Sequence, residues 1–520
     1  MQRQTSGQNH QILVVILPKP IDDLSHQLQY AASPLKTVDG CPIFIETIEH
    51  LGVDRVGLYK PVVISAFLGL GREFGPFGNI GIGKGSTNRV ALLAVAYRLE
   101  QPPPHNLKSL LRGDRLPKCL NSAKGLFECS ERSDAPLGDR ANLVALVDVD
   151  ESYSAACFKT HPTVRRYTDY RKMFDELEKK IDGVIVATPD HHHYPASMMA
   201  LKRGKHVYCE KPLTYTIEQA RLLAKVAREK KLATQMGNQG NSMESTRLIR
   251  QWIKSGVLGE VREIHHWHNF PSMEARKPRA PAQVPPGVDW DLWLGPIPPR
   301  PFTTGTIRCG WHAFSDICNG LMGNWGTHHI SAAWWALHLG APSSIEVVVQ
   351  DEWPVKESYP VGFVLKYVFP ARGARPEVTM YFHTGTKAAE APRPKHLEED
   401  RKPVGDGQVI IGSECSIMAL PHCDGARIIP EKKMKEVGKI PWTVESYGDH
   451  LGSWLQACKE GTPTASNFDF AAAVTEVALL GSIAVRHGKR LQWDATNMRF
   501  PNEPEADKYL RVELRKGWDV

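Results

Sequence analysis

Glu210 and Lys211 form a charged pair at the end of an apolar run, HVYC (206–209), and Pro212 follows them directly. Neighbouring side chains of an extended segment point to opposite faces, so the two charges cannot both face one ligand. Proline holds the residue before it in the extended region and thereby fixes the direction of Lys211. Because open parallel sheets bind ligands at the carboxyl ends of their strands, this position favours a lysine that acts on a ligand. A charged pair in a surface turn is the alternative.

A second candidate group lies in the stretch GNWGTHH (323–329). Asn324 and His328 are four residues apart, which is the spacing that places two side chains on one face of a helix. An imidazole titrates near neutrality and can take a proton from a hydroxyl group. Asn324 would orient this histidine rather than strengthen it as a base. A histidine buried in the core or in an interface is the alternative for His328.

The run His191-His192-His193 could suggest a metal site. Three adjacent residues cannot easily direct three side chains at one ion, and no carboxylate follows at a suitable spacing, so we predict no metal site. Tryptophans gather in the second half of the chain, and we expect most of them to pack in the core or between subunits. Trp311 lies in a loop-like stretch and is the one that we expect to contact a ligand.

A dinucleotide fold needs a glycine turn between its first strand and helix, where the pyrophosphate approaches backbone N–H groups. The stretch IGIGKGST supplies Gly81, Gly83 and Gly85 before the helix-like run 90–99, although its spacing is not the full fingerprint. Asp148 ends the strand-like run 141–150 and is placed to bind the ribose hydroxyls, which favours NAD over NADP. The gap from the glycines to Asp148 is far longer than the usual value of about 20 residues. We therefore expect the proline-rich stretch 101–140 to be an excursion, while an ordinary turn remains the alternative for both motifs.

The segments around these residues alternate between apolar strand-like runs and helical patterns from 61 to 236. This pattern predicts a doubly wound Rossmann domain that binds NAD, with 101–140 as an insertion. Strand-like runs without intervening helices then follow, and they predict an α+β domain with a large open, mostly antiparallel sheet over 237–520. Residues 1–60 carry no motif and remain unassigned.

Composition describes an ordinary globular chain of 520 residues with a formal net charge of +7. No block of lysine or arginine indicates a nucleic-acid partner, and no apolar run approaches the length of a membrane span, so we expect neither partner. The ten cysteines are scattered without a CxxC pair. Reduced thiols in a cytoplasmic protein are the simplest explanation.

The run 188–193, followed by Gly204-Lys205-His206 and Glu210-Lys211-Pro212, resembles the signature of the Gfo/Idh/MocA family of glucose–fructose oxidoreductases and inositol dehydrogenases. The similarity continues to the end of the chain and covers roughly residues 141–520. It implies that Lys211 faces substrate and nicotinamide, that its peptide bond to Pro212 can be cis, and that His329 and Trp311 contact substrate. It assigns cofactor binding to Thr188, Pro189, Asp190, His193, Glu210, Lys211 and Gln239. Asn324 and Ser331 stand where family members often carry acids.

The resemblance implies an NAD-dependent oxidoreductase that moves hydride between nicotinamide and a carbinol carbon of a sugar, inositol or related polyol. In this interpretation Lys211 polarises the oxygen, His328 takes its proton, and the chain forms a homo-oligomer through its C-terminal sheet. Two alternatives remain open. One is NAD-assisted glycoside cleavage without net redox, and the other is a nucleotide-bound sensor or scaffold without turnover.

Overall fold

The computed structural model describes residues 11–16, 140–268, 280–307, 310–353, 355, 357–385 and 391–520. The predicted glycine turn at Gly81, Gly83 and Gly85 lies outside the described residues. The same holds for the predicted excursion except for Arg140, at its end. The described fold therefore consists of one strand from near the start of the chain and of the elements from residue 140 onward.

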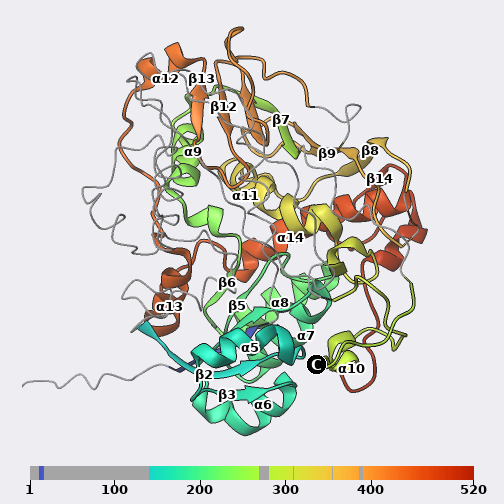
Figure 1. Cartoon of the computed structure of the whole chain (residues 1–520). Coiled ribbons are helices and arrows are strands. Elements are labelled where there is room, and N and C mark those ends of the chain that lie inside the picture. Colours follow the sequence, from blue (N-terminus) through green and yellow to red (C-terminus); the bar gives the residue numbers. More distant parts are fainter. Residues whose placement is uncertain are drawn as a thin grey trace, which may run out of the picture. The chain divides into compact units, whose positions relative to one another are not determined.

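The first layer is a six-stranded parallel sheet, in the order β3-β2-β1-β4-β5-β6. Figure 1 labels four of its strands, β2, β3, β5 and β6. Each neighbouring pair runs parallel. This confirms the doubly wound Rossmann architecture that the alternating pattern predicts. The strands are β1 (Gln11–Ile16), β2 (Asn142–Val147), β3 (Arg165–Tyr167), β4 (Gly183–Ala187), β5 (His206–Cys209) and β6 (Thr234–Met236).

Strand β1 comes from the segment that the sequence left unassigned. It lies between β2 and β4, with Ile12 opposite Leu143 on one side and opposite Gly183 on the other. Its residues QILVVI form the continuous apolar run that inner parallel strands require. The sheet therefore begins at Gln11, and a domain boundary at residue 61 leaves this strand out. Two prolines, and no glycine turn, follow this run in the sequence.

The helices of this domain are α5 (Glu151–Thr160), α6 (Tyr170–Leu177), α7 (Asp190–Lys202) and α8 (Ile217–Glu229). Polar side chains set where they begin. Asp150 and Asp169 accept hydrogen bonds from backbone N–H groups at the starts of α5 and α6, and Thr216 forms a capping box with Gln219 at the start of α8. Such caps satisfy N–H groups that the helix itself leaves without partners.

The second layer is an eight-stranded sheet in the order β13-β12-β11-β7-β10-β9-β8-β14. Its described pairs are antiparallel except β7 with β10. This confirms the predicted mostly antiparallel sheet. The strands are β7 (Val261–His268), β8 (Ser344–Gln350), β9 (Phe363–Phe369), β10 (Val378–Thr384), β11 (Gly407–Gly412), β12 (Ser416–Ala419), β13 (Arg427–Ile429) and β14 (Leu491–Gln492).

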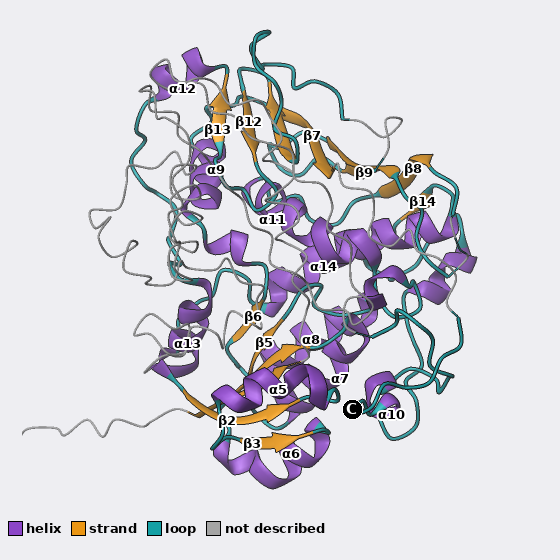
Figure 2. Cartoon of the chain, in the orientation of Figure 1, coloured by secondary structure: helices purple, strands orange, loops and turns teal. Residues whose placement is uncertain are grey.

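Helices cover one face of this sheet (Figure 2). Helix α11 packs on β7 and β11, and α14 packs on β8. The large apolar core between them includes Ile264, Phe382 and Leu480, each fully buried. The described helices of this part are α9 (Glu244–Lys254), α10 (Trp290–Leu294), α11 (Thr327–Ala336), α12 (Glu431–Val437), α13 (His450–Glu460) and α14 (Phe468–His487).

Helix α14 joins the two domains, because it also packs against α8 of the nucleotide domain. Arg221 on α8 donates two hydrogen bonds, of 2.7 and 2.8 Å, to the carboxylate of Glu476 on α14. Trp493 donates a third hydrogen bond, of 2.9 Å, to the same carboxylate. By length and composition α14 could cross a membrane, which corrects the expectation that no such run is present. However, 83% of its apolar stretch is buried inside the protein, as in a core helix of a globular domain.

Candidate active site

Polar atoms without partners gather at the carboxyl end of the parallel sheet. Asp148 Oδ2 follows β2, Thr188 Oγ1 follows β4, and Glu210 Oε1 follows β5. All three residues are at most 3% exposed, and none of these atoms meets a hydrogen-bond partner among the described residues. Buried polar atoms are almost always paired, so three exceptions at one edge indicate a site for a polar ligand. This is the edge at which open α/β sheets bind nucleotides.

Asp148 is held at the end of β2 by its own backbone and by the following turn. Its N–H donates to Tyr167 on β3, and its Oδ1 accepts from the N–H of Asp150 at 2.8 Å. Burial raises the pKa of this carboxyl well above its usual range, and the nearby Asp150 carboxylate adds to the rise. The hydrogen bond from Asp150 offsets only part of it. Asp148 is therefore a costly group to keep ionised, as ligand-binding acids often are.

We expect Asp148→Asn to stabilise the free protein at neutral pH and to weaken NAD binding. An acid with a raised pKa contributes stability while it is protonated and loses that contribution as the pH rises through its folded pKa. The gain in melting temperature should therefore be present at pH 7 and shrink as the pH is lowered. Loss of a charged hydrogen-bond acceptor should weaken NAD by about 10–100-fold.

Melting curves over a pH series and fluorescence titration with NAD measure both effects. Asp289→Asn, at the N-cap of α10, is the matched control, because asparagine caps a helix as well as aspartate does. A variant at position 148 that loses stability at neutral pH, or binds NAD unchanged, would contradict the assignment.

Lys211 meets a residue from the other domain. Its ammonium group donates a hydrogen bond to Asn324 Oδ1, and both side chains are partly exposed. Glu210 instead lies against Gly237, where an added Cβ would come within 2.5 Å of its carboxylate. The two charges thus take different directions, as their alternation predicts. The peptide bond between Lys211 and Pro212 is cis.

Asn324 lies in a π-helical turn, Met322–Gly326, which leads directly into α11. Its neighbour Gly323 allows the turn to approach Pro212, since an added Cβ would lie 3.2 Å from the proline ring and closer still to Asn319. A regular helix through this stretch was expected, and the structure corrects this. π-turns insert an extra residue into a helix and are frequent at functional sites.

His328 is buried at the start of α11 and faces other aromatic rings. Its ring centroid lies 4.4 Å from that of His422, at an interplanar angle of 78°. The Trp325 ring lies 6.0 Å away. His422 follows β12 and was missed, although a histidine directly after a predicted strand was a signal that could have been used. Ser331, at the position where relatives often carry an acid, accepts a 3.0 Å hydrogen bond from Asn238.

His193 and Asp190 are buried and engaged with backbone groups. The ring nitrogens of His193 lie 2.6 Å from the carbonyl oxygen of Pro212 and 2.7 Å from that of Thr188. Asp190 accepts a 3.1 Å hydrogen bond from the backbone N–H of Asn319 in the other domain. Both residues therefore position the Lys211 segment and the domain junction, whatever they contribute to cofactor binding. Pro189, between Thr188 and Asp190, occupies the N-cap position of α7 without a capping hydrogen bond from its side chain.

His191 and His192 do not converge on a metal position. Their Nε2 atoms both lie 2.9 Å from the carbonyl oxygen of Trp293. Burial lowers the pKa of His192 to about 4 and that of His191 well below its usual range. These two rings thus belong to the packing around α10.

The remaining predicted residues are more scattered. Gln239 is exposed at the start of a short helical turn, Gln239–Ser242. Trp311, expected in a loop, lies in the turn Gly310–Ala313, is 3% exposed and belongs to the apolar core. Its burial corresponds to the packing role that we assigned to the other tryptophans. His329 is fully buried on α11, and burial lowers its pKa well below the usual range.

Two family models match the chain. Residues 131–238 match the NAD-binding Rossmann fold of the Gfo/Idh/MocA oxidoreductase family, and residues 245–363 match its C-terminal alpha/beta domain. The chain belongs to the Gfo/Idh/MocA oxidoreductase family. Family membership assigns NAD(P) binding to the parallel sheet, in agreement with the unpaired polar atoms at its carboxyl edge.

Curated Gfo/Idh/MocA relatives are similar over short segments. A 2,7-anhydro-N-acetylneuraminate hydratase of Escherichia coli is 35% identical over 91 residues, which are 18% of this chain and 24% of that protein. A D-glucoside 3-dehydrogenase of the same organism is 34% identical over 119 residues, 23% of this chain and 33% of that protein. The chain thus spans a quarter to a third of the relatives that it matches.

A solved structure is similar over most of its length. The WlbA dehydrogenase of Chromobacterium violaceum, described in complex with NADH and UDP-GlcNAcA, covers 71% of this chain and 94% of its own. Its TM-score is 0.50 at 15% identity, so the likeness concerns the fold alone.

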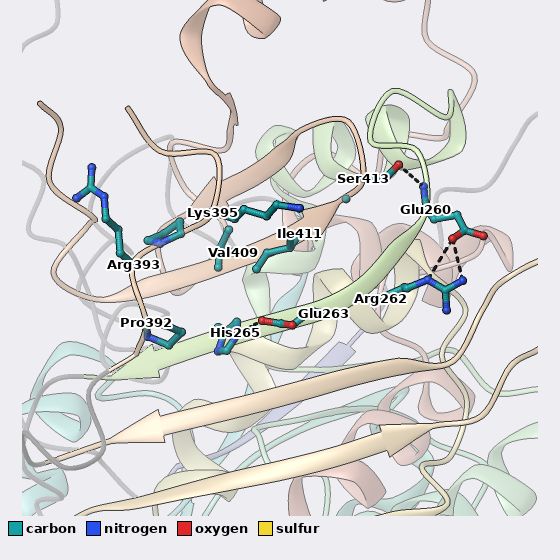
Figure 3. A pocket seen from close by; sticks show the side chains of 12 residues that line it. Glu260, Arg262, Glu263, His265, Pro392, Arg393, Lys395, Val409, Ile411 and Ser413 are labelled. Atoms are coloured by element: carbon teal, nitrogen blue, oxygen red, sulfur yellow. Dashed lines mark hydrogen bonds and ion pairs between the residues drawn. The ribbon is translucent and has the colours of Figure 1, made fainter. Parts of the chain in front are cut away.

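The Gfo/Idh/MocA chain also has a pocket on the other face of the large sheet (Figure 3). Its volume is about 370 Å³, and His265 and Glu263 line its floor from β7, 2.6 Å apart. Arg393 and Lys395 reach it from the segment before β11. None of the predicted site residues lines this pocket, and side chains alternate along β7, so it lies on the face away from α11. It is separate from the candidate active site.

Proposed function

We propose that the chain is an NAD-dependent oxidoreductase that moves hydride between nicotinamide and a carbinol carbon of a sugar, inositol or related polyol. The hydrogen bond between Lys211 and Asn324 carries the proposal. It joins the carboxyl end of β5 to the π-turn before α11 in the second domain, at the edge of the sheet where polar atoms lack partners. A substrate held there would lie between a lysine and a histidine-bearing helix.

The roles of the chain's own residues follow from this arrangement. Lys211 would donate a hydrogen bond to the reacting oxygen, and Asn324 would hold the ammonium group in position. His328 would take the hydroxyl proton as a general base, a step that typically contributes 10²–10⁴-fold to the rate. When bound, nicotinamide would accept the hydride from the carbinol carbon that carries this hydroxyl group. Asp148, Thr188 and Glu210 would hold the cofactor with the atoms that lack partners.

We propose NAD rather than NADP as the cofactor, because the buried Asp148 carboxylate would repel a 2′-phosphate. A cytoplasmic location is part of the same proposal. Its support is that none of the six cysteines among the described residues forms a disulfide bond.

Purified chain incubated with NAD and a panel of sugars, inositols and polyols tests the proposal. We expect NADH to accumulate with at least one member of the panel, and NADP to support the reaction less well. Turnover of a panel member without NADH would support redox-neutral chemistry instead. That alternative is favoured by one observation, the hydratase among the similar proteins.

A sensor or scaffold without turnover is the third candidate. It is favoured by the sequence after β1, where Leu17-Pro18-Lys19-Pro20 occupies the position of the usual glycine turn and no glycine occurs before Gly40. Nucleotide released on denaturation, measured beside turnover of the panel, separates it from both enzymes. Bound nucleotide without turnover of any panel member would leave only this candidate.

We also propose that two chains pair through the open face of the large sheet. His265, Tyr381 and His383 stack on this face, with ring centroids 4.9 Å apart for the first pair and 5.2 Å apart for the two histidines. Val348 on β8 is 51% exposed. Light scattering of the purified protein tests the pairing, and a monomer at micromolar concentration would contradict it.

A further inference from the structure

Three potential metal ligands converge beneath the large sheet, from parts of the chain that are far apart in sequence. They are His268 at the end of β7, His329 on α11 and Asp406 directly before β11. One ligand atom of each lies within 4.8 Å of the others, and His268 Nδ1 is 2.9 Å from Asp406 Oδ2. The three residues are 4%, 0% and 6% exposed. Two imidazoles and one carboxylate form a donor set typical of divalent transition metals.

The fold explains why these side chains meet. Side chains alternate along β7, so His268 faces α11 while His265 faces the outer pocket. Strands β7 and β11 run antiparallel with Gly407 opposite Trp267, and this register continues to place Asp406 beside His268. Helix α11 packs on both strands and brings His329 over them. The rings of His268 and His329 are 6.0 Å apart and almost perpendicular.

Several polar atoms around this point have no partner among the described residues. Neither ring nitrogen of His329 meets a hydrogen-bond partner, and the same holds for both nitrogens of His266. Thr384 Oγ1, on the residue paired with His268 across β10, is also without a partner. The backbone of Gly407 lies close enough to His329 to offset a small part of the lowering of its pKa, although neither ring nitrogen has a hydrogen-bond partner. Each such buried group costs about 1–3 kcal/mol when nothing binds it.

An ordinary core explains part of this arrangement, because buried histidines are often neutral packing residues. It explains the contact between His268 and Asp406, whose Nδ1 and Oδ2 atoms lie 2.9 Å apart. It does not explain why a fully buried imidazole is aimed at that pair with both nitrogens unused, beside an unpaired threonine hydroxyl. Groups of unpaired buried atoms indicate a bound water or ion. A donor set with two imidazoles favours an ion over water.

We propose that this chain binds one divalent transition metal ion, of the zinc class, through His268, His329 and Asp406. Three protein ligands leave at least one coordination position for water or for an oxygen of a bound molecule. The prediction of no metal considered only the adjacent histidines 191–193, whereas these ligands come from three separate elements. The inference does not depend on the proposed oxidoreductase activity.

Metal analysis of the full chain tests the proposal. The protein is stripped with a chelator, incubated with Zn²⁺ or Co²⁺ and dialysed. We expect about one ion per chain and visible absorption bands for the Co²⁺ form. His329→Gln and Asp406→Asn should each lower the affinity by more than the 10–100-fold that supporting residues typically contribute.

His265→Gln is the matched control, because His265 lies on β7 like the ligand His268 but faces the opposite side of the sheet. It should retain the metal. Zn²⁺ should raise the melting temperature of this variant and of the wild type, but not that of the two ligand variants. If a ligand variant fails to fold, X-ray absorption of the wild-type Co²⁺ form decides. Imidazole and oxygen ligands would support the site. No retained metal, sulfur ligands, or equal loss of metal in the His265→Gln variant would overturn it.

Discussion

Lys211→Ala should lower turnover by about 10²–10⁴-fold while the affinity for NAD changes little. The lysine follows the end of β5, and its ammonium group donates to Asn324 in the other domain. The residue therefore spans the junction in which substrate would lie. The expected ribose-binding acid, Asp148, follows β2, and two strands, β1 and β4, separate β2 from β5. Alanine removes the hydrogen-bond donor and leaves the strand unchanged.

Lys205→Ala is the matched control, because Lys205 directly precedes β5 and so lies at its opposite end. Turnover on whichever substrate proves active is measured beside cofactor binding by fluorescence. The control should match the wild type in both. If Lys211→Ala loses NAD binding, or if both variants turn over normally, the lysine has been assigned to the wrong partner.

Local sequence patterns were sufficient for most of the two sheets. Strands β4 and β5 are continuous apolar runs between helical patterns, and β7 to β10 follow strand-like runs without helices. These strands form because their own residues become buried, and the hydrophobic pattern of the sequence predicts which residues those are. The direction of Lys211 was also predictable, since Pro212 restricts it and alternation separates it from Glu210.

Other features depend on contacts between distant segments, and local patterns do not record them. The run at β1 gains its meaning only from pairing with β2 and β4, more than a hundred residues later in the chain. The approach of His422 to His328 requires the loop after β12 to reach the start of α11. The convergence of His268, His329 and Asp406 likewise depends on the register of β7 and β11. The π-turn before α11 has no sequence signature beyond its glycines.

His328→Asn should lower turnover by about 10²–10⁴-fold with little change in NAD affinity. His328 is the second residue after the π-turn that carries Asn324, and so lies on the same segment that meets Lys211. Its ring contacts His422, in a setting where an imidazole can accept a proton from a hydroxyl and pass it on. Asparagine keeps polarity but cannot act as a base near neutrality. The loss should therefore appear in kcat more than in KM.

His338→Asn is the control for this change. His338 is exposed just after α11 and has a positive φ of 50°, a conformation that asparagine tolerates well. Steady-state kinetics of both variants are compared with their melting temperatures and NAD titrations. A loss of activity in His328→Asn that is matched by lost stability would indicate a packing histidine instead. Retained stability and cofactor binding, with turnover reduced in this variant alone, would leave proton transfer as the role that His328 supplies.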